Sequence, residues 1–254
     1  MYRLVRGFSE GAPYWAYEEA GVGHRVLTAA PWLGGVPTGE LRYGRLLAPV
    51  TPSKIIGIGS NYRDHAAEMG KPVPARPKLF LKPPSAVVAT GDRVAIPPLT
   101  ERVDHEAELG VVIGRRAHRV AEADALEFVW GYTCVNDVTA RDFQRDDGVF
   151  ARAKGFDGFC PVGPAVVRGL DPTALDVACF VNGVARQAGN TRDMVFGVAA
   201  LVAFVSSVMT LEPGDLIATG TPAGVGPVVS GDTVVVRVAG IGDLHTTFHD
   251  RDDR

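Results

Sequence analysis

Three acidic residues at alternate positions are the first feature of this sequence that could carry chemistry. Residues 102–114, RVDHEAELGVVIG, place Asp104, Glu106 and Glu108 before an apolar run. Side chains two positions apart on a strand share a face, so a single strand here would aim all three carboxylates at one place. Such a cluster needs relief from solvent or from a cation. Hard divalent cations such as Mg²⁺ prefer oxygen ligands and would supply such relief, although the pattern by itself more often indicates a solvated polar face.

A fourth acid, Asp137, lies in CVNDVTARD on the next predicted strand. Glu106, Glu108 and Asp137 would meet across neighbouring strands, and three protein oxygens would leave positions for substrate and water. That open arrangement is typical of a catalytic metal site. The alternative for any E-x-E in a strand is a solvated polar face, since charged residues are mostly exposed.

A histidine and a glutamate form a second candidate pair in GSNYRDHAAEMG, residues 59–70. His65 and Glu68 are three positions apart, which makes their side chains neighbours on a helix. A carboxylate that orients a histidine raises its basicity, so the pair would serve as a general base toward water. The alternative is an ordinary surface pair on a helix.

Two further stretches carry side chains that donate hydrogen bonds to an acid. ARDFQ, residues 140–144, contains Arg141 and Gln144, and RAKGFDGFC contains Lys154. Arg141 and Gln144 would clamp an acidic or amide-like oxygen, and Lys154 would balance the acids or bind a substrate carboxylate. The alternatives are a structural salt bridge from Arg141 to Asp146 or Asp147, and a solvated loop lysine.

The Gly-rich stretch ATGTPAGVG, residues 218–226, is open to two interpretations. Backbone N–H groups in such turns bind anions, but a plain Gly/Pro turn is the better explanation of this motif taken alone. It is not a P-loop, because no Gly-Lys-Ser/Thr follows. Asn182 and Gly183 predict a hairpin turn, and we expect Arg186 and Gln187 after it to be structural.

Short strands dominate the predicted secondary structure. Residues 1–50 form a small β-rich segment, and PVTPSK, residues 49–54, links it to a main domain over 51–254. Helices are expected near 61–70, with Asn61 as N-cap, and over 191–208, with Asn190 or Thr191 as cap. Gly-Asp turns before β-branched runs predict antiparallel strands near the C-terminus. The pattern indicates a β-rich α+β fold with a few short helices.

The composition excludes several classes of protein. The chain has 254 residues, is 46% hydrophobic and 22% charged, and carries a net charge of −3, which argues against a nucleic-acid or anionic-membrane surface. The longest apolar run, 195–209, is too short for a membrane span, and MYRLVRGFSE lacks the apolar region of a signal peptide. Three cysteines without CxxC spacing argue against a disulfide framework and predict a cytoplasmic location.

Taken together, the motifs resemble the fumarylacetoacetate hydrolase family, and the similarity spans residues 54–240. Seven stretches carry it, in the family's order: GSNYRDHAAEMG, KPPSAV, VDHEAELGVVIG, GYTCVNDVTARDFQ, KGFDGFCPVGP, VNGVARQAGNT and TGTPAGVG. The short N-terminal segment resembles the compact branch that handles acylpyruvates, oxaloacetate or homoprotocatechuate-pathway intermediates. Many relatives have Ser at the position of Thr139 and Thr at the position of Gly158.

The resemblance implies a role for each candidate residue. Glu106, Glu108 and Asp137 match the positions that bind Mg²⁺ or Mn²⁺ in the family, whereas Asp104 has no ligand role there. The matching catalytic residues are His65, Glu68 and Lys154. The matching substrate contacts are Arg141, Gln144 and Thr221. The family fold is a mixed β-sandwich or roll, commonly in a homodimer.

The expected function is metal-dependent chemistry on a small 2-oxo acid. The resemblance implies hydrolysis of a C–C bond or decarboxylation of acylpyruvate-type or dicarboxylic acids, or their enols, through a metal-stabilised enolate. One alternative is 2-hydroxyhepta-2,4-diene-1,7-dioate isomerase activity in aromatic catabolism. Another is a non-catalytic metal-binding module, which would have no need of His65, Glu68 and Lys154.

Overall fold

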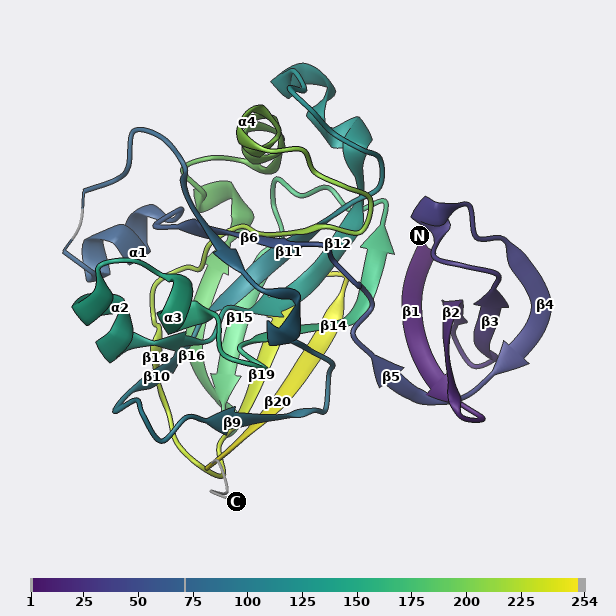
Figure 1. Cartoon of the computed structure of the whole chain (residues 1–254), viewed down its shortest axis with the longest axis horizontal. Helices are drawn as coiled ribbons and strands as arrows, with labels where there is room; N and C mark the ends of the chain where they lie inside the picture. The colour runs from purple at the N-terminus through teal and green to yellow at the C-terminus, as the bar shows by residue number, and fades with distance from the viewer. Residues whose placement is uncertain (1, 71, 251–254) are drawn as a thin grey trace.

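A computed structural model describes residues 2–70 and 72–250 of the chain. One large sheet runs across the whole molecule (Figure 1), and most of its neighbouring strands are antiparallel. In spatial order its strands are β4 (Pro37–Arg42), β3 (Gly23–Leu27), β2 (Ala12–Glu19), β1 (Tyr2–Ser9), β14 (Cys160–Arg168), β12 (Val129–Asn136), β11 (Ala107–Ile113), β17 (Leu216–Ala218), β6 (Ile55–Gly59) and β7 (Lys78–Lys82). The short strands β5 (Arg45–Leu47) and β8 (Val87–Val88) pair with β1 and β14.

Two smaller sheets pack with this one. The five-stranded sheet has the order β16 (Val184–Asn190), β15 (Asp176–Val181), β19 (Thr233–Val238), β20 (Gly242–Asp250) and β9 (Arg93–Ile96). The three-stranded sheet has the order β13 (Thr139–Ala140), β10 (Val103–His105) and β18 (Gly226–Val228). The arrangement confirms the predicted β-rich α+β fold, and β19 and β20 are the expected antiparallel strands near the C-terminus.

The central strands β11 and β12 are buried on both faces. Along β11, Leu109 and Val111 join one hydrophobic cluster and Val112 joins the other. The same alternation on β12 places Cys134 in the first cluster and Val135 in the second. Because side chains alternate across a strand, an apolar run such as LGVVI suits a strand covered on both sides. Glu108, which precedes this run on β11, is therefore held on a rigid strand.

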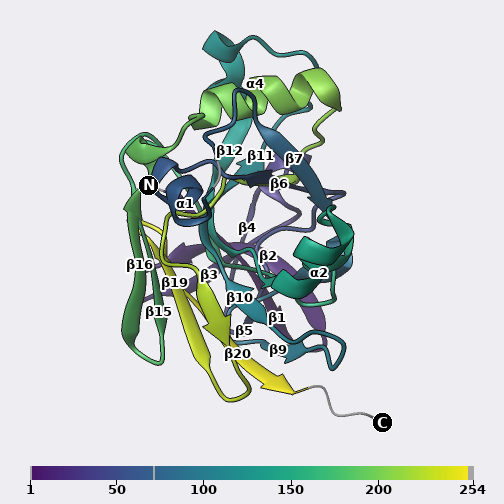
Figure 2. The same cartoon turned by 90° about the vertical axis from the view of Figure 1, so that its left-hand side faces the viewer.

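The helices are few and short. They are α1 (Arg63–Glu68), α2 (Arg141–Asp147), α3 (Ala151–Lys154) and α4 (Val198–Val208), with 3-10 turns η1 (Pro31–Leu33), η2 (Pro84–Ala86), η3 (Glu122–Phe128) and η4 (Thr191–Asp193). Figure 2 shows α1 and α2 on the same side of the molecule, away from the N-terminal strands. None of the helices in the described residues is long and apolar enough to cross a membrane.

The helix predicted over 191–208 begins later than expected. Asn190 caps only the 3-10 turn η4, by accepting a hydrogen bond from Arg192 N, and the N-cap of α4 is Gly197. Residues 194–197 are held outside the helix because Asn61 O accepts from Val195 N at 2.7 Å. The Asn61 side chain is engaged there too, so the prediction that it caps the first helix is wrong. Tyr62 is the N-cap of α1.

The acidic stretch is not one strand, which corrects the first prediction. It divides into β10 and β11, in different sheets, and Glu106 lies between them. The three acids therefore do not share one strand face. The hairpin predicted at 182–183 is confirmed, since Asn182 and Gly183 have φ values of 51° and 77° and join β15 to β16.

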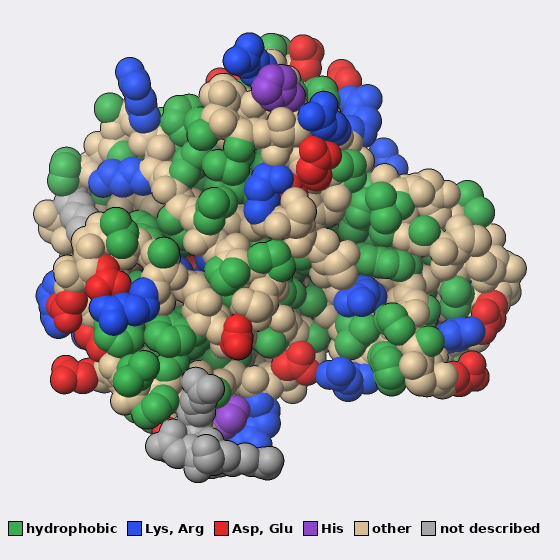
Figure 3. Space-filling view, viewed as in Figure 1, with side chains coloured by type: hydrophobic (Ala, Val, Ile, Leu, Met, Phe, Trp, Pro, Cys, Tyr) green, Lys and Arg blue, Asp and Glu red, His purple; other side chains and the backbone are tan. Residues whose placement is uncertain are grey.

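The first 50 residues form strands on one side of the molecule (right in Figure 1), and β1 pairs with β14 of the remaining chain. The boundary at residue 50 between two domains stays a prediction. Basic and acidic side chains are mixed over the face seen in Figure 3, in line with the small net charge.

Candidate active site

Three carboxylates converge beside the central strands. Ligand oxygens of Glu106, Glu108 and Asp137 all lie within 4.8 Å of one another, and all three residues are buried. Glu108 is on β11, and Asp137 directly follows β12. The backbone of Glu106 is held between them, because Asn136 Oδ1 accepts from Glu106 N at 3.0 Å and Glu106 O accepts from Asp137 N at 2.9 Å. These buried acids are not the solvated face that an E-x-E pattern more often indicates.

Two lysines hold the Asp137 side of the cluster. Lys154, at the end of α3, donates through Nζ to Glu106 Oε2 at 3.0 Å, to Thr139 Oγ1 at 2.8 Å and to Asp137 Oδ2. Lys82, the last residue of β7, donates to Asp137 Oδ1 at 2.6 Å. Lys154 is buried, so it is not a solvated loop lysine. Sequence analysis missed Lys82, whose only local signal is a lysine at the end of the apolar strand KLFLK.

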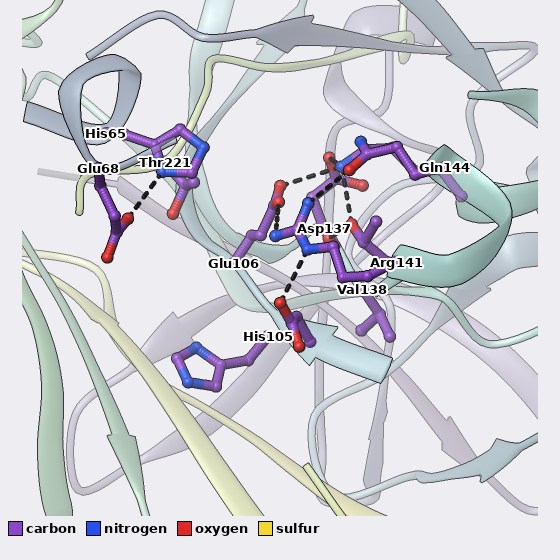
Figure 4. A network of polar contacts seen from close by, with 12 residues as sticks. His65, Glu68, His105, Glu106, Asp137, Val138, Arg141, Gln144 and Thr221 are labelled. Carbon is purple, nitrogen blue, oxygen red and sulfur yellow. Dashed lines mark hydrogen bonds and ion pairs between the residues drawn. The ribbon is translucent and has the colours of Figure 1, made fainter. Parts of the chain in front are cut away.

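Arg141 connects the cluster to a fourth acid. Its Nη2 donates to Glu106, its Nε donates to Asp104 Oδ2 at 2.8 Å, and its Nη1 donates to Gln144 Oε1 at 2.9 Å. Figure 4 shows the Arg141 guanidinium between Glu106 and Gln144. Asp104 thus lies behind Arg141 rather than in the metal-ligand group. The alternative partners of Arg141 at 146 and 147 are wrong, since those acids pair with Arg145 and Arg152.

The carboxylates of the cluster differ in how closely positive charges neutralise them. Burial raises the pKa of Glu106, but the neighbouring Lys154 and Arg141 outweigh burial and hold this pKa well below its usual range. Burial and the nearby Asp137 and Glu106 carboxylates raise the pKa of Glu108 well above its usual range. Within the described residues, the one hydrogen bond to the Glu108 carboxylate comes from Gly220 N at 2.8 Å. Three hard oxygen donors, one of them without a cationic partner among the residues that the structure describes, fit a divalent metal ion.

The histidine and glutamate predicted as a pair are in contact. His65 Nδ1 and Glu68 Oε2 lie 3.1 Å apart on α1, and Glu68 Oε1 accepts from Gly224 N at 3.0 Å. His65 is buried, so the pair is not an exposed one on a helix surface. Glu68 therefore orients the ring from behind.

Thr221 is positioned by Gln187, one of the two residues after the hairpin turn that we expected to be structural. Its Oγ1 donates to Ala107 O at 2.8 Å and accepts from Gln187 Nε2 at 2.7 Å. Gln187 Oε1 in turn accepts from Ala107 N at 2.9 Å. Gln187 is buried and ties the Gly-rich stretch to the start of β11, which agrees with the structural role predicted for it.

The predicted site residues gather around one small cavity. Its volume is about 30 Å³, enough for a water molecule or an ion. All of the site residues expected from the sequence line it except Glu68, namely His65, Glu106, Glu108, Asp137, Arg141, Gln144, Lys154 and Thr221. We call it the inner cavity. An acidic group, a general-base candidate and hydrogen-bond donors for an anion therefore face one another.

This fold and this cluster define a fumarylacetoacetate hydrolase-type protein. The family model for the C-terminal domain of fumarylacetoacetate (FAA) hydrolase matches residues 54–249, and the chain belongs to this family. Family members are enzymes, among them hydrolases and isomerases, and they generally use a divalent metal. An uncharacterized protein of Archaeoglobus fulgidus is 51% identical over 203 residues, which are 80% of this chain and 81% of that protein.

Solved structures agree over nearly the whole chain. The 2-hydroxyhepta-2,4-diene-1,7-dioate isomerase from Mycobacterium marinum superposes with a TM-score of 0.92 at 40% identity, covering 100% of both chains. The 5-carboxymethyl-2-hydroxymuconate delta-isomerase from Mycobacterium smegmatis gives 0.91 at 41% identity, covering 98% of this chain and 100% of the other. Fumarylacetoacetate hydrolase from Exiguobacterium antarcticum gives 0.84 at 36% identity, covering 99% and 100%.

Proposed function

We propose that this chain is a Mg²⁺- or Mn²⁺-dependent enzyme that acts on small 2-oxo acids or their enols. The reaction is hydrolysis of a C–C bond in an acylpyruvate-type acid, or decarboxylation of a 2-oxo dicarboxylic acid. The observation that carries the proposal is the buried group of Glu106, Glu108 and Asp137, which lines the same cavity as His65.

The carboxylates and the cations have distinct tasks in this proposal. Glu106, Glu108 and Asp137 would hold the metal, which supplies Lewis acidity toward the oxygens of a 2-oxo acid. Lys154 and Arg141 line the cavity beside them. The three N–H groups of Lys154 already serve Glu106, Asp137 and Thr139, so Lys154 would balance the charge of the acids, whereas Arg141 offers its remaining N–H groups to the substrate carboxylate. Because several acids already anchor these two cations, little ordering of their side chains is needed when substrate binds.

His65 is the proposed general base. Its Nδ1 faces Glu68, so Nε2 is the nitrogen that remains for a proton from water in the cavity. Hydrolysis requires that proton transfer, because the attacking water must lose a proton as it adds to the carbonyl carbon. Decarboxylation needs no attacking water, so His65 would matter less for that reaction. Gln144 and Thr221 complete the proposed substrate contacts.

An isomerase is the second candidate, favoured by the two mycobacterial isomerase structures at 40% and 41% identity. In that reaction His65 would move a proton along a dienol, as a step of aromatic catabolism. The same cavity and the same donors suit both reactions, so substrate turnover has to separate them.

A substrate panel tests the proposal directly. The purified protein is assayed with acetopyruvate, oxaloacetate and 2-hydroxyhepta-2,4-diene-1,7-dioate, each with Mg²⁺, with Mn²⁺ and with EDTA. We expect turnover of at least one 2-oxo acid that EDTA abolishes and metal restores. Turnover of the dienol alone assigns the isomerase. Metal binding without any turnover would instead indicate the non-catalytic metal-binding module.

The proposal includes a homodimer located in the cytoplasm. Three buried, unpaired cysteines, Cys134, Cys160 and Cys179, suit a reducing compartment. Light scattering on the 26.9 kDa chain would measure the mass of the assembly, and cell fractionation would locate it.

A further inference from the structure

The inner cavity opens toward a much larger space. A second cavity of about 630 Å³, which we call the outer cavity, shares Met69, Arg141, Gln144 and Phe150 with the lining of the inner one. The inner cavity, at about 30 Å³, has room for an ion or a water molecule but not for a chain of several carbons. A substrate that reaches an ion there must therefore extend into the outer cavity.

The outer cavity carries an excess of positive charge. Its described lining contains three arginines, Arg102, Arg141 and Arg145, and a single acid, Asp104. Asp104 accepts from Arg102 Nε at 2.8 Å and Nη2 at 3.2 Å, and also from Arg141. One carboxylate is thus shared by two guanidinium groups, although Arg141 also donates to Glu106 and Arg145 pairs with Asp146. Within the described residues Asp104 is the one carboxylate paired with Arg102, so a ligand that carries a negative charge would find a cation there that shares its acid with Arg141.

Arg102 is the arginine best placed to bind such a charge. Its hydrogen bonds within the described residues use Nε and Nη2, so Nη1 is available to a ligand. Its side chain is 54% exposed and yet is anchored at two points, which limits the entropy lost when a ligand binds. Arg145 is 75% exposed and pairs with Asp146, which is not among the lining residues.

The lining shared by the two cavities is half apolar. Met69 and Phe150 contribute a thioether chain and an aromatic ring, beside the polar side chains of Arg141 and Gln144. The order along the site is a carboxylate and lysine cluster, this mixed section, and then Arg102 and Arg145. A matching ligand has an acidic 2-oxo head, a short hydrocarbon section that contacts Met69 and Phe150, and a distal anion.

We infer that Arg102, assisted by Arg145, recognises a distal carboxylate of the substrate and selects 2-oxo or enol dioic acids over analogues with a neutral tail. The inference rests on the proposed function, because a metal ion in the inner cavity must bind the 2-oxo acid head. Arg102 is then a specificity-determining residue outside the catalytic group.

Calorimetric binding of two matched ligands tests the inference without any turnover. 2-Oxoheptanedioate and 2-oxoheptanoate have the same chain length and differ in the distal carboxylate, and both are titrated in saturating Mg²⁺. We expect the wild type to bind the dioate at least about tenfold more tightly, the effect of one charge-assisted hydrogen bond. Arg102→Gln should reduce that preference about tenfold, Arg145→Gln should reduce it less, and Arg102→Lys should restore part of it.

Arg237→Gln is the matched control. Arg237 also has 54% of its side chain exposed and is also held by one carboxylate, that of Asp243, through Nε and Nη2 at 2.6 Å each. It lies on β19, and it does not line the outer cavity. This variant should keep the wild-type preference. Arg102→Gln leaves Asp104 paired with Arg141, so we expect it to fold, and Arg145→Gln offers a second variant on the helix α2.

The outcomes separate the inference from the function on which it rests. Equal wild-type affinity for the two ligands, or an equal loss of both in Arg102→Gln, would overturn the distal-carboxylate inference and leave the proposed function standing. Failure of both ligands to bind the Mg²⁺-loaded wild type would overturn the two together.

Discussion

Lys82 Nζ lies 2.6 Å from Asp137 Oδ1, and both side chains are buried. Lys154 donates to the other oxygen of the same carboxylate. Asp137 is therefore held between two ammonium groups that come from different elements, β7 and α3. This double anchor orients one proposed metal ligand before any metal binds, and it couples the stability of the fold to the charge of the site.

Replacing Lys82 should destabilise the metal-free protein. Lys82→Met leaves a buried carboxylate with one cation fewer, and breaking a buried ion pair costs about 3–5 kcal/mol. Saturating Mn²⁺ should return part of that loss, because a bound cation stabilises the native state by mass action. Urea unfolding with EDTA and with Mn²⁺ measures both effects.

Lys54→Met is the control for this prediction. Lys54 also pairs with a buried acid, Asp215, but neither residue lines the inner cavity. Lys54→Met should lower the free energy of unfolding. The rise in that free energy on adding Mn²⁺ should be no larger than in the wild type. A Lys82→Met protein as stable as the wild type in EDTA would contradict the anchoring role.

The two glutamates of the cluster should respond differently to neutralisation. Glu108→Gln removes the carboxylate that lacks a cation, so it should leave the metal-free protein as stable as the wild type or more so. Glu106→Ala removes one carboxylate partner from both Lys154 and Arg141 and should destabilise the metal-free protein. Both variants should lose Mn²⁺ affinity by at least about 100-fold, as expected for direct ligands.

Calorimetric titration with Mn²⁺ and thermal unfolding in EDTA measure these effects. The exposed Glu212→Gln serves as the control and should bind Mn²⁺ as the wild type does. Wild-type Mn²⁺ content in Glu106→Ala would refute its assignment as a ligand.

The histidine variant should separate hydrolysis from decarboxylation. His65→Ala should lower kcat for an acylpyruvate by about 10²–10⁴, the usual contribution of a general base, and should reduce oxaloacetate decarboxylation much less. Glu68→Gln should cause a smaller loss, since Glu68 acts through His65. Steady-state kinetics on both substrates gives the comparison, with the exposed His118→Ala as control. Full hydrolase activity in His65→Ala would exclude the base role.

The acid stability of the protein should depend on Asp142, in the first turn of α2. Burial raises the pKa of this carboxyl, but hydrogen bonds from Thr100, Glu101 N and Phe143 N outweigh burial and hold it below 3.8. The native state thus binds this proton more weakly than the unfolded chain. The resulting stability is present above about pH 3.8 and is lost as the pH falls through the lower native pKa.

Asp142→Asn should therefore lower the stability at pH 7 by about 1 kcal/mol and flatten the acid limb of the stability curve. Unfolding in urea from pH 2.5 to 7 measures both. Asp124→Asn, an exposed acid on η3, should leave the curve unchanged. An unaltered acid limb in Asp142→Asn would show that the hydrogen bonds to this carboxylate contribute nothing to the pH dependence of stability.

Local spacing was enough to find the pair on α1 and the two glutamates. His65 and Glu68 are one helical turn apart, and their contact follows from the geometry of any helix. Glu106 and Glu108 were identified from their residue types and their alternate positions. The sequence predicted one strand there, whereas the structure has two, β10 and β11. The division at Glu106 could not be predicted, because it depends on which strands β10 and β11 pair with.

Ion pairs between residues far apart in the chain could not be predicted from local sequence patterns. Lys82 and Asp137 are 55 positions apart, and the pairing of Arg141 with Asp104 spans 37. Residue types nevertheless made Arg141 and Lys154 candidates, because buried acids demand cations. Which cation serves which acid depends on the packing of α2, α3 and β7 against the central strands.

The amino-acid sequence by itself determined the family, the β-rich fold and the residue types of the inner cavity, because short motifs and strand periodicity are local properties of a chain. Only the tertiary structure decided that no cation of the described segments pairs with Glu108, that Lys82 holds Asp137 and that arginines line an outer cavity. These features are sums of charge and volume contributed by segments far apart in sequence. Coulomb interactions and packing depend on distances in space, which no local pattern specifies.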